Sequence, residues 1–123
     1  MEREIRPGVW IGRGVRANQA TLNALRPPVI IGNFVTLEEG AIVGPNVVIG
    51  QDWIIQSGAK VSGSLLLPPF YEDRLDAFKV VHPGTEIREC IIAGGEINRG
   101  QTHEKKIIVV APNGELAVSA LEM

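Results

Sequence analysis

The chain has 123 residues and is poor in several residue types that mark particular protein classes. Its single cysteine, Cys90, cannot form a disulfide within the chain and fits a reducing compartment. Aromatic residues make up only 5% of the chain, so aliphatic side chains must fill the core. No apolar run approaches the roughly 20 residues of a membrane-spanning helix. Because the first segment, MEREIRPG, also lacks the apolar stretch of a signal peptide, we expect a cytoplasmic protein with no membrane partner.

Basic residues are sparse and scattered along the chain. The net charge is -2 at pH 7, and the densest basic pair is Lys105–Lys106. A nucleic-acid-binding surface needs a cluster of lysines and arginines that neutralises several phosphates. We therefore expect no nucleic-acid partner.

Glycine, proline and regularly spaced aliphatic residues are abundant. The 14 glycines and 8 prolines indicate many turns. A helix repeats after about 3.6 residues and a strand after two, but the aliphatic residues of one long segment return at every sixth position. These residues are Ile31, Leu37, Val43, Ile49, Ile55 and Val61.

Short strands that alternate with bends explain a period of six. Position 5 of one six-residue unit and position 1 of the next face the same side of a strand, because they lie two residues apart. Positions 2 to 4 carry glycine, proline, asparagine and acidic residues, which favour turns. Such a chain must coil, and each coil stacks on the previous one at a spacing of about 4.8 Å. The sequence therefore predicts an all-β solenoid whose layers stabilise one another.

The six-residue units resemble those of the hexapeptide-repeat superfamily of left-handed parallel β-helices. Three units form one triangular coil in that superfamily, and the resemblance implies both this coil and the left hand. Two segments look like the C-terminal β-helix domain of sugar-phosphate nucleotidyltransferases of the mannose-1-phosphate guanylyltransferase type. They are RPPVIIGNFVTLEEGAIVGPNVVIGQDWIIQSGAKVSGSLLL (26–67) and GTEIRECIIAGGEIN (84–98), and the resemblance covers residues 9–100.

A coil of three units predicts which residues share the core. Residues that lie 18 positions apart should stack in one buried column. The predicted columns are Ile31–Ile49–Leu67, Leu37–Ile55 and Val43–Val61. The regular spacing is interrupted at TLNAL (21–25) and at PPFYEDRLDAFKV (68–80), where we expect slipped or looped coils.

The predicted organisation has two parts. Residues 1–100 form the β-helix, with an N-terminal cap and the irregular segment at 68–80. Residues 101–123 form a polar connector and a capping β-hairpin. The hairpin spans 106–120 and turns at Asn113–Gly114, a pair suited to a tight two-residue turn. A solenoid end exposes unpaired strand edges and core, so it needs such a cap.

Position 6 of the unit faces outward and carries the candidate interface. On one face this position is occupied by Ile30, Val48 and Leu66, which stack into an apolar stripe. Exposed stripes of this kind usually mark an interface. We expect a homo-oligomer with these residues at or beside the contact. A closed trimer is favoured, and a dimer through the solenoid ends is the alternative.

Candidate catalytic residues are few. His82, at a coil corner after the irregular segment, is the candidate general base of an acyltransferase. His103, in the polar connector, is a less suitable candidate. A catalytic zinc in this superfamily needs three histidines, and the chain has two, so we expect no metal. No motif indicates a cofactor.

Cys90 and Trp53 have mainly structural interpretations. Cys90 takes position 4 of its unit, which predicts an inert turn or surface thiol. Trp53 takes position 5, where small residues are usual. It either packs a widened corner or stacks on a ligand.

Two functions stay open from the sequence. The resemblance implies a non-catalytic β-helix module of nucleotide-sugar metabolism, which assembles subunits or docks onto a nucleotidyltransferase catalytic domain. The Gly-rich phosphate loop of that catalytic part is not found, because GRGVR (12–16) lies inside a six-residue unit and opens no helix. The alternative is a small acyltransferase that uses His82 and binds an acyl-CoA between subunits. If the chain is an enzyme, we expect a transferase, either an acyltransferase or part of a nucleotidyltransferase.

Overall fold

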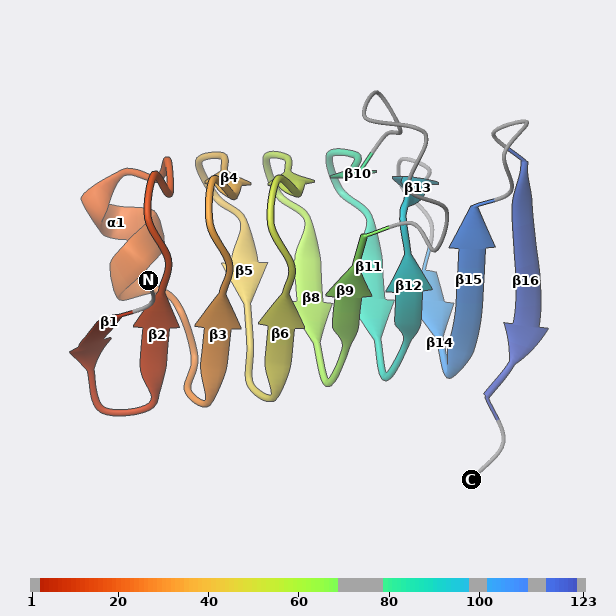
Figure 1. Cartoon of the computed structure of the whole chain (residues 1–123), viewed down its shortest axis with the longest axis horizontal. Coiled ribbons are helices and arrows are strands. Elements are labelled where there is room, and N and C mark those ends of the chain that lie inside the picture. Colours follow the sequence, from red (N-terminus) through yellow and green to blue (C-terminus); the bar gives the residue numbers. More distant parts are fainter. Residues whose placement is uncertain (1–2, 69–78, 98–101, 111–114, 122–123) are drawn as a thin grey trace.

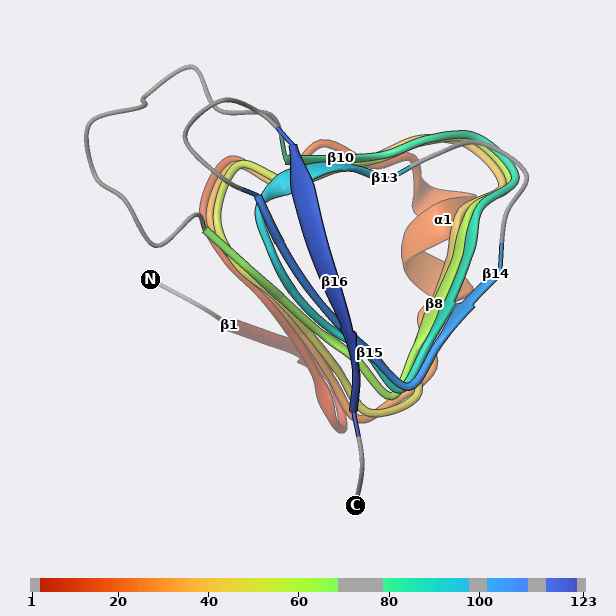
Figure 2. The same ribbon diagram turned by 90° about the vertical axis from the view of Figure 1, so that its right-hand side faces the viewer.

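A computed structural model shows three β-sheets that form the sides of a triangular coil (Figures 1 and 2). It describes residues 3–68, 79–97, 102–110 and 115–121. The largest sheet contains, in spatial order, β1 (Arg3–Arg6), β2 (Val9–Ile11), β3 (Val29–Ile31), β6 (Val47–Ile49), β9 (Leu65–Leu67), β12 (Ile91–Ala93), β15 (Lys106–Val110) and β16 (Leu116–Ala120). The second contains β4 (Thr36–Leu37), β7 (Ile54–Ile55), β10 (Lys79–Val81) and β13 (Gly95–Ile97). The third contains β5 (Ile42–Val43), β8 (Lys60–Ser62), β11 (Glu86–Arg88) and β14 (Thr102–Glu104).

The coils wind with the expected left hand. In Figure 1 the parallel strands of the largest sheet, β2, β3, β6, β9, β12 and β15, run upward in front, and the strands of the third sheet run downward behind, as the chain advances from left to right. Pairing between coils is parallel throughout, whereas β1 with β2 and β15 with β16 pair antiparallel. The predicted left-handed parallel β-helix with a C-terminal β-hairpin is therefore confirmed.

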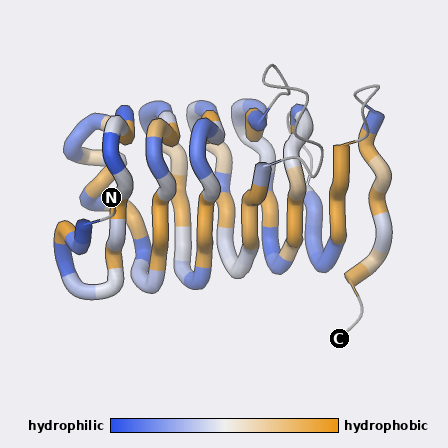
Figure 3. The backbone as a smooth tube through the Cα atoms, viewed as in Figure 1, coloured by the Kyte–Doolittle hydropathy of each residue, from blue (hydrophilic) through white to orange (hydrophobic). Residues whose placement is uncertain are grey.

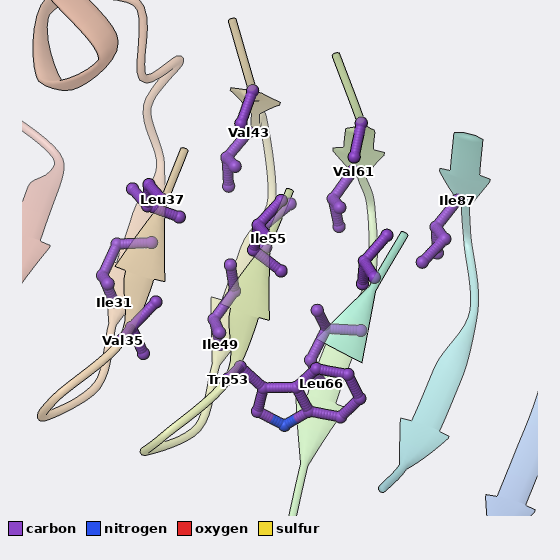
Figure 4. Packing of buried hydrophobic residues seen from close by; sticks show 14 of the residues in the cluster. Ile31, Val35, Leu37, Val43, Ile49, Trp53, Ile55, Val61, Leu66 and Ile87 are labelled. Carbon is purple, nitrogen blue, oxygen red and sulfur yellow. The ribbon is translucent and has the colours of Figure 1, made fainter. Parts of the chain in front are cut away.

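Aliphatic columns fill the triangle, as the six-residue spacing predicts (Figure 4). Ile31 stacks on Ile49, Leu37 on Ile55 and Val43 on Val61, and all six side chains are buried. The first column then departs from the prediction, because Ile49 pairs with the buried Leu66 and not with Leu67.

One shortened turn causes this shift. The turn that follows Val43 reaches the next inward position at Val47, whereas the turn that follows Val61 reaches it one residue earlier, at Ser64. On that side of the coil, each residue after the turn therefore takes the position that the six-residue spacing assigns to the residue that follows it. Leu66 therefore takes the core position, and Leu65 faces outward.

The next coil repeats the shortened turn and places Cys90 in the core. The backbone N–H of Cys90 donates to Ser64 Oγ (3.0 Å), and that hydroxyl donates to the carbonyl of Ser62 (2.7 Å). Cys90 lies in the turn between β11 and β12, as one of the two predictions has it, and its burial contradicts the alternative of a surface thiol. Burial raises the pKa of its thiol, which favours the protonated form, and the predicted inertness stays a prediction.

The irregular segment near the N-terminus forms a helix. Helix α1 (Gln19–Asn23) begins after Asn18, whose side-chain oxygen accepts from the N–H of Thr21 (2.8 Å). Arg6 of β1 donates to the carbonyls of Leu22 (2.9 Å) and Leu25 near the end of this helix. The first residues therefore hold the helix against the first coil, as a cap.

Parallel pairing continues beyond residue 100. Strand β14 pairs with β11, and β15 pairs with β12, so the segment that looks like a polar connector belongs to a further coil. The hairpin of β15 and β16 is confirmed by its regular antiparallel register. Its predicted turn at Asn113–Gly114, and residues 69–78 of the irregular segment, lie outside the described residues.

Candidate interaction surface

The outer face of the largest sheet carries a continuous row of apolar side chains. In each strand the residue between two inward-facing positions points outward. The parallel register places these outward residues beside one another from coil to coil. We name this row the apolar ladder: Trp10, Ile30, Val48, Leu65, Ile91 and Ile107. Figure 3 shows the hydrophobic colour of these strands repeating along the molecule.

The ladder is most exposed at its N-terminal end. Trp10 is 41% exposed, Ile30 42% and Leu65 39%, while Val48 is partly buried between them. A pocket of about 250 Å³ opens beside this end, between Trp10, Pro28, Ile30 and Val48. Such a hollow, apolar surface suits the side chains of a protein partner.

The ladder corrects the predicted interface at one residue. Ile30 and Val48 face outward as expected, but Leu66 is fully buried in the core. Leu65 takes its place, because of the shortened turn before it. The sequence prediction also missed Trp10, Ile91 and Ile107. They could have been found by extending the outward position to the first and last coils.

His82 lies at a coil corner, directly after β10. Its Nε2 is 3.2 Å from Oε1 of Glu96, and both side chains are partly exposed. The N–H of His82 donates to the carbonyl of Ile97 (3.0 Å), and its carbonyl accepts from Thr85 (3.2 Å). The structure thus gives the imidazole a carboxylate neighbour, which could orient it as a general base.

His103 lies on the inner face of its strand. It pairs with Ile87 in the core column that contains Val43 and Val61. Its Nε2 is buried and has no hydrogen-bond partner within the part of the chain that the structure describes. Burial, and then the charge of Lys106, lower the pKa of the imidazole.

Trp53 packs inside the coil (Figure 4), with its side chain fully buried. Its Nε1 donates to the carbonyl of Leu67 (3.2 Å). This arrangement confirms the packed corner and excludes the ligand-stacking alternative, because no face of the indole is accessible. Tyr71, which the 18-residue spacing would place one coil after Trp53, lies outside the described residues.

The described residues contain neither a metal-binding cluster nor a membrane-spanning helix. Within the ranges that the structure covers, no three His, Cys, Asp or Glu side chains gather as a metal site would require. None of the described helices has the length and apolar character needed to cross a membrane.

One comparison with known proteins supports the predicted relation. The UTP–glucose-1-phosphate uridylyltransferase of a Synechocystis strain is 39% identical to the chain over 64 residues. The match covers 51% of this chain and 16% of that protein, so the chain spans a small part of the relative's length. By its name the relative is a sugar-phosphate nucleotidyltransferase, the class that the motifs resemble, although it is a uridylyltransferase and not a guanylyltransferase. No protein-family profile and no solved structure matches the chain.

Proposed function

We propose that the chain is a non-catalytic β-helix module of nucleotide-sugar metabolism that assembles its own copies through the apolar ladder, or docks them onto a nucleotidyltransferase catalytic domain. The ladder is the observation that carries this proposal. The similarity to a small part of a uridylyltransferase supports the metabolic context. It does not by itself require that the chain perform the transfer.

The energy of the ladder favours association. Full burial of a large aliphatic side chain contributes about 1.5–3 kcal/mol. Ile30 and Leu65 are about two-fifths exposed, so covering each would contribute roughly 1 kcal/mol. Three copies that meet around a three-fold axis would cover this face and leave no open end to polymerise. A homotrimer is therefore the favoured assembly.

Light scattering of ladder variants tests the proposal. We expect the double variant Val48→Glu, Leu65→Lys to lower the molar mass to a third of the wild-type value, because two charges would have to be buried in the contact. The far-UV circular dichroism should not change, since both side chains point outward.

Ile42→Glu is the matched control, because Ile42 occupies the outward position of the third sheet. It should leave the mass unchanged. A wild-type monomer, or a folded double variant with the wild-type mass, would contradict the assignment.

The contact between His82 and Glu96 supports a second candidate, the small acyltransferase. In that reaction His82 would take a proton from the acceptor hydroxyl or amine as the acceptor attacks the thioester carbonyl of an acyl-CoA. The C–S bond would then break, and the released CoA would take the proton from the imidazole. Thermal unfolding with acetyl-CoA or a nucleotide-sugar separates the candidates. A large stabilisation by acetyl-CoA, together with turnover that His82→Gln abolishes, would favour the acyltransferase.

A further inference from the structure

The two edges of the largest sheet differ sharply in character. Strand β1 has the sequence Arg-Glu-Ile-Arg, and charged side chains of this kind prevent another strand from adding to an edge. Strand β16 has the sequence Leu-Ala-Val-Ser-Ala, with no charge and no proline. It therefore lacks these two common protections of an edge strand.

Strand β16 also carries a core-facing side chain, Val118, that the described residues leave about half exposed. Val118 lies opposite Ile108, so both side chains are on the inner face of the sheet. Ile108 is fully buried, whereas Val118 is 53% exposed, the highest value among the large hydrophobic side chains of the described residues. Figure 2 shows β16 crossing the end of the coil stack, beyond the last coil. The core column therefore continues onto β16 and opens to solvent there.

The backbone of β16 offers a regular set of free groups. The N–H of Leu121 donates to the carbonyl of Lys105 (2.7 Å). Because backbone groups alternate sides along an antiparallel strand, Ser119 and Ala117 also direct their groups to β15. Leu116, Val118 and Ala120 then direct theirs to the open edge.

We propose that β16 pairs with β16 of a second copy of this chain, antiparallel and about a two-fold axis at Val118. In this register Val118 meets its own copy, and Leu116 meets Ala120. These are the residues whose backbone groups face the edge, so each pair can exchange two hydrogen bonds. No charged side chain is placed opposite another, and both copies cover the exposed Val118.

A second copy fits this edge because the strand complements itself. A two-fold contact uses the same strand on both sides, so it satisfies both open edges and closes without forming a fibre. The contact would join two coil stacks end to end. This inference deepens the proposed assembly function and rests on it, but it uses a different surface from the apolar ladder.

Light scattering of the full chain, with two variants of β16, tests the pairing. Val118→Lys places a charge on the edge, and Ala120→Pro removes an edge N–H while leaving the groups that face β15. Each should halve the wild-type molar mass without changing the circular dichroism. Ile5→Lys, at an exposed apolar position of β1, is the matched control and should leave the mass unchanged.

The results distinguish this contact from the ladder. If Val48→Glu, Leu65→Lys lowers the mass but both folded β16 variants keep it, the pairing of β16 is wrong and the proposed function stands. If the β16 variants halve the mass and the ladder variant keeps it, the ladder is not a contact. Should both β16 variants unfold, amide hydrogen exchange of the wild type decides. Slow, concentration-dependent exchange at Val118 and Ala120 supports the pairing, and fast exchange at assembling concentrations overturns it.

Discussion

His103 is an ionisable residue at a position where the other coils carry aliphatic side chains. The column contains Val43, Val61 and Ile87 before it reaches His103. Because burial and Lys106 lower the pKa of the imidazole below its ordinary value of 6.5, the folded state holds it neutral. The imidazole therefore makes the stability of the last coil depend on pH.

The sign of this dependence follows from proton binding. Above pH 6.5 neither state holds the proton, so His103 makes no pH-dependent contribution to the free energy of unfolding. As the pH falls below 6.5, the unfolded chain binds a proton that the folded chain resists, and stability decreases until the lowered pKa of the folded state is passed. Urea unfolding at several pH values should show this loss in the wild type.

His103→Leu should remove that part of the slope, because leucine suits the aliphatic column. His82→Gln is the control, since it should retain the slope that belongs to His103. Equal slopes in the wild type and His103→Leu would show that the imidazole is not held neutral by the fold.

The sequence shows which residues of a strand face the core only as long as all turns have the same length. Ile31 and Ile49 are predicted correctly, because glycine follows each of them and marks the turn. Leu65, Leu66 and Leu67 are chemically identical, so their pattern does not say which one faces inward. The shortened turn at Ser64 decides it, and one missing residue exchanges the core and surface sides of a strand. The interface prediction failed at Leu66 for this reason alone.

At the scale of the element, a glycine corner holds adjacent coils in close contact. Gly44 has φ 103°, and a Cβ at this position would lie 2.0 Å from the carbonyl oxygen of Arg26. Gly84 has φ 74°, but its Cβ would meet nothing within 4 Å. A substitution at Gly84 therefore tests backbone strain alone, whereas a substitution at Gly44 tests backbone strain together with a steric clash.

We expect Gly84→Ala to lower the free energy of unfolding by about 1–2 kcal/mol, the cost of a left-handed backbone at a residue with a Cβ. Gly44→Ala should cost a further 1–3 kcal/mol or so, because the coils must also move apart. Chemical denaturation of both variants measures the difference. Equal losses would mean that the corner at Gly44 adapts freely.

Strands that carry aliphatic residues at the six-residue spacing were predictable from the sequence, and a strand without such residues was missed. β14 has the sequence Thr-His-Glu, so it looks like a connector, yet its backbone pairs with β11 like any other coil. Helix α1 interrupts the first coil, and Asn18 with Thr21 is a capping signal that could have revealed it. Pairing to the preceding coil, which sequence spacing cannot show, makes the segment of β14 a strand.

At the scale of the whole molecule, a β-helix buries its interior one layer at a time, so its sides and ends are its main surfaces for association. Here one side carries the apolar ladder, and one end carries the unprotected β16. The opposite end is covered by β1 and α1, which Arg6 links. Association is therefore expected at the ladder and at β16, and not at the end that β1 covers.

The two tryptophans report on the ladder independently of molar mass. Trp10 is 41% exposed in the single chain and lies in the ladder, whereas Trp53 is fully buried in the core. If copies assemble through the ladder, they cover Trp10, and acrylamide should quench the wild-type fluorescence weakly at assembling concentrations. Val48→Glu, Leu65→Lys should increase the quenching, because Trp10 returns to solvent while Trp53 keeps its surroundings. Adding Trp10→Phe to this variant should abolish the increase; if the increase persists without Trp10, it comes from a loosened core, and the ladder is not the contact.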